Sequence, residues 1–68
     1  MTRLEAFLRT HRIRPMDLHR YSLVSRQHIN RLRNGTMEPT RRIMVLLAQG
    51  CTRILRQRVT VSDLFDLE

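Results

Sequence analysis

Four side chains able to form paired hydrogen bonds lie close together in the sequence: Arg26, Gln27, Asn30 and Arg31. Arginine can bond twice to one guanine, and glutamine or asparagine can bond twice to one adenine, through atoms exposed in the DNA major groove. On a helical wheel they project away from Ile29 and Leu32, with Arg26 on the flank. The spacing therefore predicts a helix over residues 25–33 with one apolar face and one face suited to reading base pairs.

An ordinary solvated helix can carry the same polar side chains, so the positions of three arginines at predicted helix starts matter. Arg26 stands in the first turn of this predicted helix, and Arg41 and Arg42 stand in the first turn of the next. A helix N-terminus is partly positive, so a cation there is destabilising by about 0.3–1 kcal/mol. A phosphate bound beside such an arginine and the N-terminus of its helix would compensate the repulsion between them. These positions favour a nucleic-acid backbone as the partner.

The composition also favours a polyanionic partner, and it favours a helical fold. The chain has 68 residues, enough for one domain, and its 13 basic residues are all arginine against six acidic ones, a formal net charge of +7. The positive charge lies in residues 1–58, because the last ten residues contain acidic groups only. Such a surface attracts polyanions. Few glycines, prolines and aromatic residues favour helices over a β-barrel.

The periodicity of apolar residues predicts a single all-α domain of four to five helices, at about 2–12, 15–22, 25–33, 40–56 and 60–67. Capping boxes at Thr2 with Glu5 and at Thr60 with Asp63 mark the starts of the first and last helices. Gly50 falls inside the fourth helix, where it either bends the helix or splits it in two. That alternative stays open from sequence alone.

Residues 13–35 contain a recognisable pattern. It consists of an apolar residue in a first helix, a turn ending in Val-Ser, an Ile and a Leu three apart, and a closing Asn-Gly: Leu18, Val24, Ser25, Ile29, Leu32, Asn34 and Gly35. In these features the chain resembles the Xre/Cro-like (lambda repressor-like) helix-turn-helix family, and residues 60–65 resemble its last helix. Two positions depart from the pattern. His19 stands where the family prefers a small residue, and Leu23 stands where it prefers glycine, so Leu23 needs a left-handed backbone or a different turn.

The resemblance implies a division of roles among the polar residues. It implies base contacts from Arg26, Gln27 and Arg31, with Asn30 a weaker candidate. It implies phosphate contacts from Arg14, Pro15, Ser25, Asn34, Gly35 and Thr36. The positions on the predicted helices add His28, Arg41 and Arg42 as further phosphate-contacting candidates.

Other chemistries find little support in the sequence. The three histidines and Cys51 match no zinc spacing, and no catalytic triad order, carboxylate pair or glycine-rich phosphate loop appears. We therefore expect no enzyme activity, no metal, no cofactor and no small-molecule ligand. The single cysteine, the absence of an apolar run near 18 residues and the lack of a signal-peptide pattern favour a cytoplasmic protein without a membrane partner. Binding to DNA would make it nucleoid-associated.

The leading hypothesis is a transcriptional regulator that binds double-stranded DNA as a homodimer on a palindromic or repeated site. The second hypothesis is a protein-interaction module, such as an antitoxin-like partner, built on the same helix-turn-helix. Binding of structured RNA through the basic face is the third. Arginines at helix N-termini favour the first, because a protein partner has less need of them.

Overall fold

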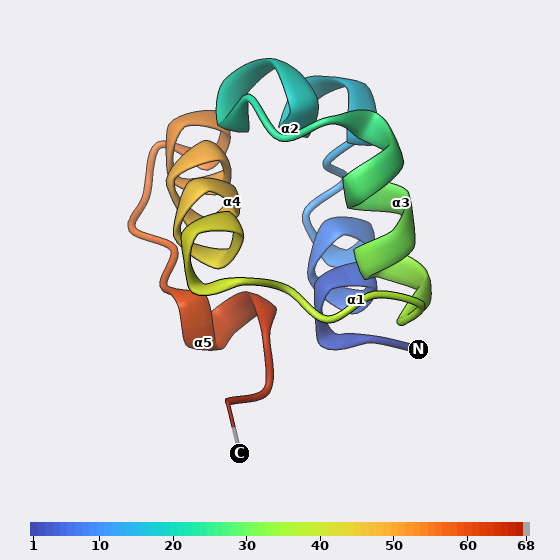
Figure 1. The fold of residues 1–68 in the computed structure, drawn as a ribbon. Coiled ribbons are helices and arrows are strands. Elements are labelled where there is room, and N and C mark those ends of the chain that lie inside the picture. Colours follow the sequence, from blue (N-terminus) through green and yellow to red (C-terminus); the bar gives the residue numbers. More distant parts are fainter. Residues whose placement is uncertain (68) are drawn as a thin grey trace.

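The computed structural model describes residues 1–67, which form helices and no strands. It has five helices: α1 (Arg3–Thr10), α2 (Pro15–Ser22), α3 (Arg26–Asn34), α4 (Arg41–Leu55) and α5 (Val61–Leu64) (Figure 1). The predicted all-α class is confirmed. Glu68, counted above among the acidic residues of the last ten, lies outside the described residues.

The helices surround one core. α2 packs most extensively against α4, α3 packs on α1 and α2, and α5 packs on α1 and α4. Figure 1 shows α3 and α4 on opposite sides of the molecule, with α2 across the top. Every helix contributes to the core, and three connecting segments add one residue each; the buried apolar residues are Leu4, Leu8, Ile13, Leu18, Val24, Ile29, Leu32, Leu47, Ala48, Cys51, Val59 and Leu64.

The starts of α1, α3 and α4 are capped by the hydroxyl group of the residue before each helix. The hydroxyls of Thr2, Ser25 and Thr40 accept hydrogen bonds from backbone N–H groups three residues later, at 3.1, 3.1 and 3.2 Å. At α5 the Asp63 carboxylate also accepts from the Thr60 N–H, at 2.9 Å. The predicted capping box at α1 is only half formed, because the Glu5 carboxylate turns away to bind an arginine of α3.

The last helix is shorter than predicted. The expected range was 60–67, but α5 ends at Leu64, and Phe65 is extended at φ −135° and ψ 142°. Leu64 is fully buried, and Phe65 also packs against the core. The extended backbone at Phe65, whose side chain packs on the core, ends the helix at a point where the local sequence pattern allowed it to continue.

Gly50 does not split the fourth helix, because α4 runs unbroken from Arg41 to Leu55. Its role is a close approach to α2. A Cβ atom at this position would lie 2.9 Å from Cβ of Ser22 and 3.1 Å from the Ser22 backbone. The missing side chain lets these two helices meet.

Replacing Gly50 by Ala should therefore destabilise the fold, although alanine favours an isolated helix by about 1 kcal/mol. The added methyl meets backbone, which cannot rotate away, and overpacking of this kind typically costs about 1–3 kcal/mol. Urea unfolding measures the change. Gln49→Ala, at an exposed neighbouring position, is the control and should change stability by no more than about 0.5 kcal/mol. A Gly50→Ala variant as stable as the parent would show that α2 and α4 separate freely.

The turn between α2 and α3 accommodates both residues that depart from the family pattern, His19 and Leu23. Leu23 adopts the left-handed conformation, with φ 64° and ψ 10°, and is 84% exposed. His19 is exposed rather than wedged between the helices, and its Nδ1 lies 2.7 Å from the carbonyl oxygen of Val24. The histidine thus ties the end of α2 to the turn, and the turn keeps its tight shape with a leucine in it.

Leu23→Gly should stabilise the protein by about 0.5–1 kcal/mol. The left-handed conformation costs an L-residue about 1–2 kcal/mol, and glycine removes this strain. The stabilisation is smaller than the strain because glycine loses more conformational entropy on folding than leucine does. Leu23→Ala is the matched control, since it removes the exposed side chain and keeps the strain. Thermal unfolding of both variants tests this, and equal stability of the two would contradict it.

Candidate nucleic-acid interface

α3 presents the four predicted base-reading residues on one exposed surface. Ser25 fixes the start of the helix by capping it, and Gly35 ends it in the left-handed conformation at φ 73°. Ile29 and Leu32 hold the helix against the core, at 0% and 4% exposure. The side chains on the other side are all exposed: Arg26, Gln27, Asn30 and Arg31.

These four residues differ in how many polar groups they have free. Within residues 1–67, the side chains of Arg26, Gln27 and Arg31 have no hydrogen-bond or ion-pair partner. The Asn30 Oδ1 accepts a hydrogen bond from Arg33 at 3.2 Å. Asn30 keeps its amide donors for a ligand but has its acceptor occupied, which agrees with its place as the weaker candidate.

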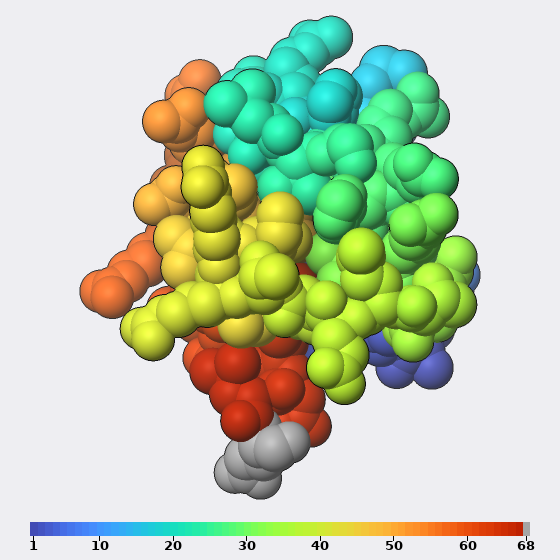
Figure 2. Space-filling model, viewed as in Figure 1, coloured from blue at the N-terminus to red at the C-terminus, as the bar shows by residue number. Residues whose placement is uncertain are grey.

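The start of α4 supplies a second set of unpaired cations. Arg41 and Arg42 are exposed, and neither α3 nor α4 has an acidic residue in its first turn. Figure 2 shows α3 (green) and the start of α4 (yellow) on one face of the molecule. A ligand that covers this face would meet both helices, and an anion there would relieve the repulsion between each arginine and its helix N-terminus.

The candidate phosphate-contacting residues at the starts of α2 and α3 already have polar partners within the chain. Arg14 is exposed and lies 3.5 Å from the carboxylate of Asp17, while Pro15 occupies the first position of α2. The Ser25 hydroxyl lies 3.2 Å from Nδ1 of the half-buried His28. A phosphate at either place would compete with these contacts.

The loop after α3 is more fully committed to ending the helix. The N–H groups of Gly35 and Thr36 donate to carbonyls of α3, at 3.3 and 3.0 Å. The Thr36 hydroxyl also donates to the Arg31 carbonyl, at 3.2 Å. Among Asn34, Gly35 and Thr36, the exposed side chain of Asn34 is therefore the donor best placed to reach a phosphate.

The sequence analysis missed the contact that anchors the far end of α3. Arg33 donates from Nε and Nη2 to the two carboxylate oxygens of the buried Glu5, at 2.9 and 3.1 Å. The Thr2 hydroxyl adds a bond to the Arg33 carbonyl at 2.7 Å. Arg33 is thereby used for structure rather than for a ligand. No local pattern signals this pair, since its partners are 28 residues apart.

The Arg33 guanidinium, more than the charge of Arg9, holds the pKa of Glu5 below its ordinary value of 4.5. Glu5→Gln should lower the free energy of unfolding at pH 7 by about 1–2 kcal/mol, since Arg33 keeps some solvent contact. The folded pKa is below the unfolded one, so this contribution is complete above the unfolded pKa and is lost as pH falls through the folded value.

Urea unfolding of both proteins from pH 7 down to pH 3 measures this difference, which should shrink only at the acidic end. Asp17→Asn, which removes the exposed contact to Arg14, is the control and should cost at most about 1 kcal/mol. A Glu5→Gln effect equal at all pH values would show that packing, not the ion pair, carries the contribution.

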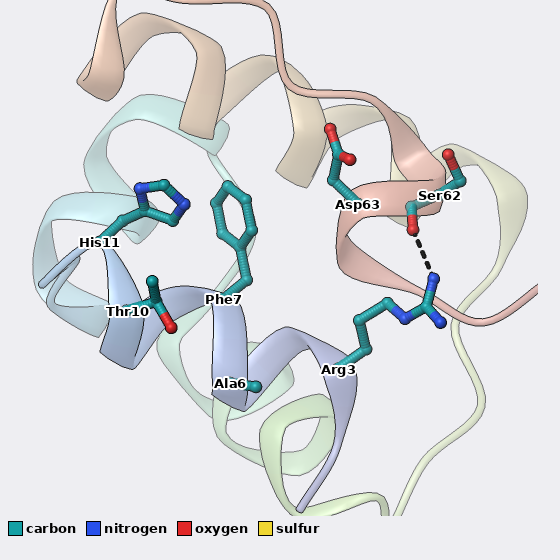
Figure 3. Close-up of a pocket in the computed structure, with 7 residues that line it drawn as sticks. All are labelled: Arg3, Ala6, Phe7, Thr10, His11, Ser62 and Asp63. Atoms are coloured by element: carbon teal, nitrogen blue, oxygen red, sulfur yellow. Dashed lines mark hydrogen bonds between the residues drawn. The ribbon is translucent and has the colours of Figure 1, made fainter.

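A second surface feature, a depression of about 350 Å³, lies between α1 and α5. Figure 3 shows Arg3 reaching across it to the Ser62 carbonyl, at 2.9 Å. Phe7 of α1 and His11, directly after the helix, lie side by side. The centroids of those two rings are 4.2 Å apart. The hydrogen bond from Arg3 to Ser62 joins α1 to α5 across this depression.

Burial raises the pKa of the Cys51 thiol to about 11, so this cysteine is a core residue. Over residues 1–67, no three His, Cys, Asp or Glu side chains come together to hold a metal ion. No helix in that range is both long and apolar enough to cross a membrane.

Comparisons of the chain with protein-family models, curated proteins and solved structures found no match.

Proposed function

We propose that this protein is a sequence-specific regulator of transcription that binds double-stranded DNA, with α3 lying in the major groove. The observation that carries the proposal is the exposed set on α3, formed by Arg26, Gln27, Asn30 and Arg31, on the same face as the unpaired arginines that begin α4. A major groove about 12 Å wide admits one helix, and these side-chain types match the edges of guanine and adenine.

We infer different tasks for the exposed side of α3 and for the start of α4. α3 is held from behind by Ile29 and Leu32, so its polar side chains can reach base edges while the helix stays packed. Arg41 and Arg42 lie outside that set, at the start of the next helix, where they suit the phosphates that flank the groove. This is the docking of lambda repressor-like domains that the sequence resemblance implies.

Two copies are needed for useful specificity. α3 has nine residues and offers three or four base-reading side chains, which covers only a few base pairs. We propose a homodimer on a palindromic or repeated site, with half-sites about 34–36 Å apart, one helical turn of DNA. Action on chromosomal promoters would make the protein nucleoid-associated in the cytoplasm.

Selection of bound sequences from a random duplex library tests the proposal. The chain should enrich a short motif, present twice at a spacing of about 10–10.5 base pairs centre to centre. The double variant Gln27→Ala and Arg31→Ala, which keeps the buried face of α3, is the control and should enrich that motif poorly. If the parent protein enriches no motif, base reading by α3 is wrong and the protein-interaction hypothesis takes its place.

A further inference from the structure

Asn30 is the base-reading candidate whose side chain is held in place by the protein itself. Its Oδ1 accepts a hydrogen bond from Nη1 of Arg33 at 3.2 Å. The Arg33 side chain is only 25% exposed, whereas Asn30 is exposed together with Gln27 and Arg31. A partly buried arginine thus contacts an exposed side chain that belongs to the proposed DNA-binding surface.

The guanidinium of Arg33 is fixed in turn by α1. Its Nε and Nη2 donate to the two carboxylate oxygens of Glu5, at 2.9 and 3.1 Å, and the Glu5 side chain is 12% exposed. Figure 1 shows α1 and α3 side by side, and the two helices pack on each other. Because a guanidinium is planar and rigid, the two bonds to Glu5 also fix the direction in which Nη1 donates.

The chemistry of the guanidinium decides which atom of the Asn30 amide faces Arg33. A guanidinium has donors and no acceptor, while an asparagine amide has one oxygen acceptor and one NH2 group with two donors. The oxygen must face Arg33, because an NH2 group there would set donor against donor. The NH2 group therefore lies on the other branch of the amide, away from Arg33, and is the part of Asn30 left for a ligand.

We propose that Arg33 is a positioning residue that makes Asn30 a hydrogen-bond donor to DNA and gives it a preference for guanine. The inference rests on the proposed function. A free asparagine pairs best with adenine, because it donates to N7 and accepts from N6. Guanine presents two acceptors, N7 and O6, at the same edge. An amide whose oxygen is turned to Arg33 matches guanine and leaves the N6 donor of adenine unanswered.

The same contacts make base preference depend on a buried residue of α1. Glu5 holds Arg33, and Arg33 holds Asn30, so a change at Glu5 reaches the DNA through two side chains. The charge of Arg33 is paired with Glu5, which sets it apart from the exposed arginines proposed to bind phosphate. Loss of the pair should therefore change which base is preferred and leave the salt dependence of binding unchanged.

The test first locates the base pair that Asn30 contacts. In competition binding on the selected motif, Asn30→Ala should relax the preference at one position of the half-site. The parent should favour guanine over adenine there by at least about 5-fold, the lower end of the discrimination given by a paired contact. Asn30→Asp keeps an acceptor for Arg33 but has no donor, so it should lose this preference. A parent that favours adenine at that position would overturn the inference.

Two double variants separate the two arginines beside Glu5. Glu5→Gln with Arg33→Met removes the anchor without leaving a buried charge, and glutamine can bond to the Thr2 N–H in a capping box. Glu5→Gln with Arg9→Met makes the same charge changes at the other arginine, 3.9 Å from Glu5, and is the matched control. The first should bind adenine at least as well as guanine at the Asn30 position, and the control should keep the guanine preference. The same preference in both would overturn the inference.

Repeating the measurement without Asn30 tests whether Arg33 acts through it or only through stability. In an Asn30→Ala background, Glu5→Gln with Arg33→Met should leave the base preference at that position unchanged, because the two effects are coupled. Equal effects with and without Asn30 would overturn the positioning role. Asn30→Asp changes only an exposed side chain, so it tests the inference independently of the stability of the double variant.

The two proposals fail in different ways. If both Asn30 variants keep the preference of the parent at every position while Gln27→Ala relaxes it, the inference is wrong and the proposed function stands. If the parent enriches no motif, the proposed function itself is wrong.

Discussion

Affinity for the preferred duplex should fall by about 10³–10⁵-fold between about 50 and about 200 mM salt, as expected for a complex that neutralises about 6–10 phosphates. Three of the candidate phosphate-contacting residues in each copy are exposed arginines, Arg14, Arg41 and Arg42, so two copies reach the lower end of that number. Binding then releases condensed counterions, and added salt opposes that release.

The slope of log affinity against log salt measures the effect, at about −0.9 for each phosphate contacted. Arg42→Ala should make this slope shallower by about one unit for each copy bound. Asn34 and the other uncharged candidates should affect affinity without changing the slope in that way. An affinity that stays constant over the same salt range would rule out a phosphate-bound complex.

Loss of sequence preference is the second large effect expected. Gln27→Ala and Arg31→Ala should each lower affinity for the preferred duplex by about 1–3 kcal/mol, roughly 5- to 150-fold, since each removes one paired contact to a base. Each should also relax the preference at one position of the half-site. Both side chains are exposed and unpartnered within the described residues, so the fold should keep its stability.

The matched comparison uses arginines outside α3. Arg41→Ala and Arg42→Ala should weaken preferred and scrambled duplexes alike, because a phosphate contact carries no sequence information. Competition binding of the four variants on both duplexes measures the contrast. If the α3 variants and the α4 variants lose preference to the same extent, the separation of base readers from phosphate holders is wrong.

The local features of the fold could be predicted because they depend on neighbouring residues. Ser25 and Thr40 cap helices as hydroxyl residues before a helical stretch do, and Ile29 and Leu32 face the core as their spacing requires. The exposed position of the four polar residues on α3 follows directly from that spacing. A single sequence was therefore enough for the fold class and for the helix proposed to read bases.

Features that depend on contacts between distant residues could not be predicted. Glu5 fits a capping box, yet in the folded chain it binds Arg33, because a guanidinium is a stronger partner than the backbone N–H of Thr2. α5 ends at Leu64 because Phe65 packs on the core with an extended backbone. Gly50 has low helix propensity but is required by its contact with Ser22. In each case tertiary packing decides between locally acceptable alternatives.

The central claim is that α3 reads bases in the major groove, and base analogues test it most directly. Replacing each guanine or adenine of the selected motif by its 7-deaza form removes the N7 acceptor from the major groove while base pairing is kept. The parent should lose about 1–3 kcal/mol at the purines that Arg26, Gln27 or Arg31 contact, and Arg31→Ala should lose nothing further at the purine that Arg31 contacts. Undiminished affinity of the parent with every N7 removed in turn would contradict the account.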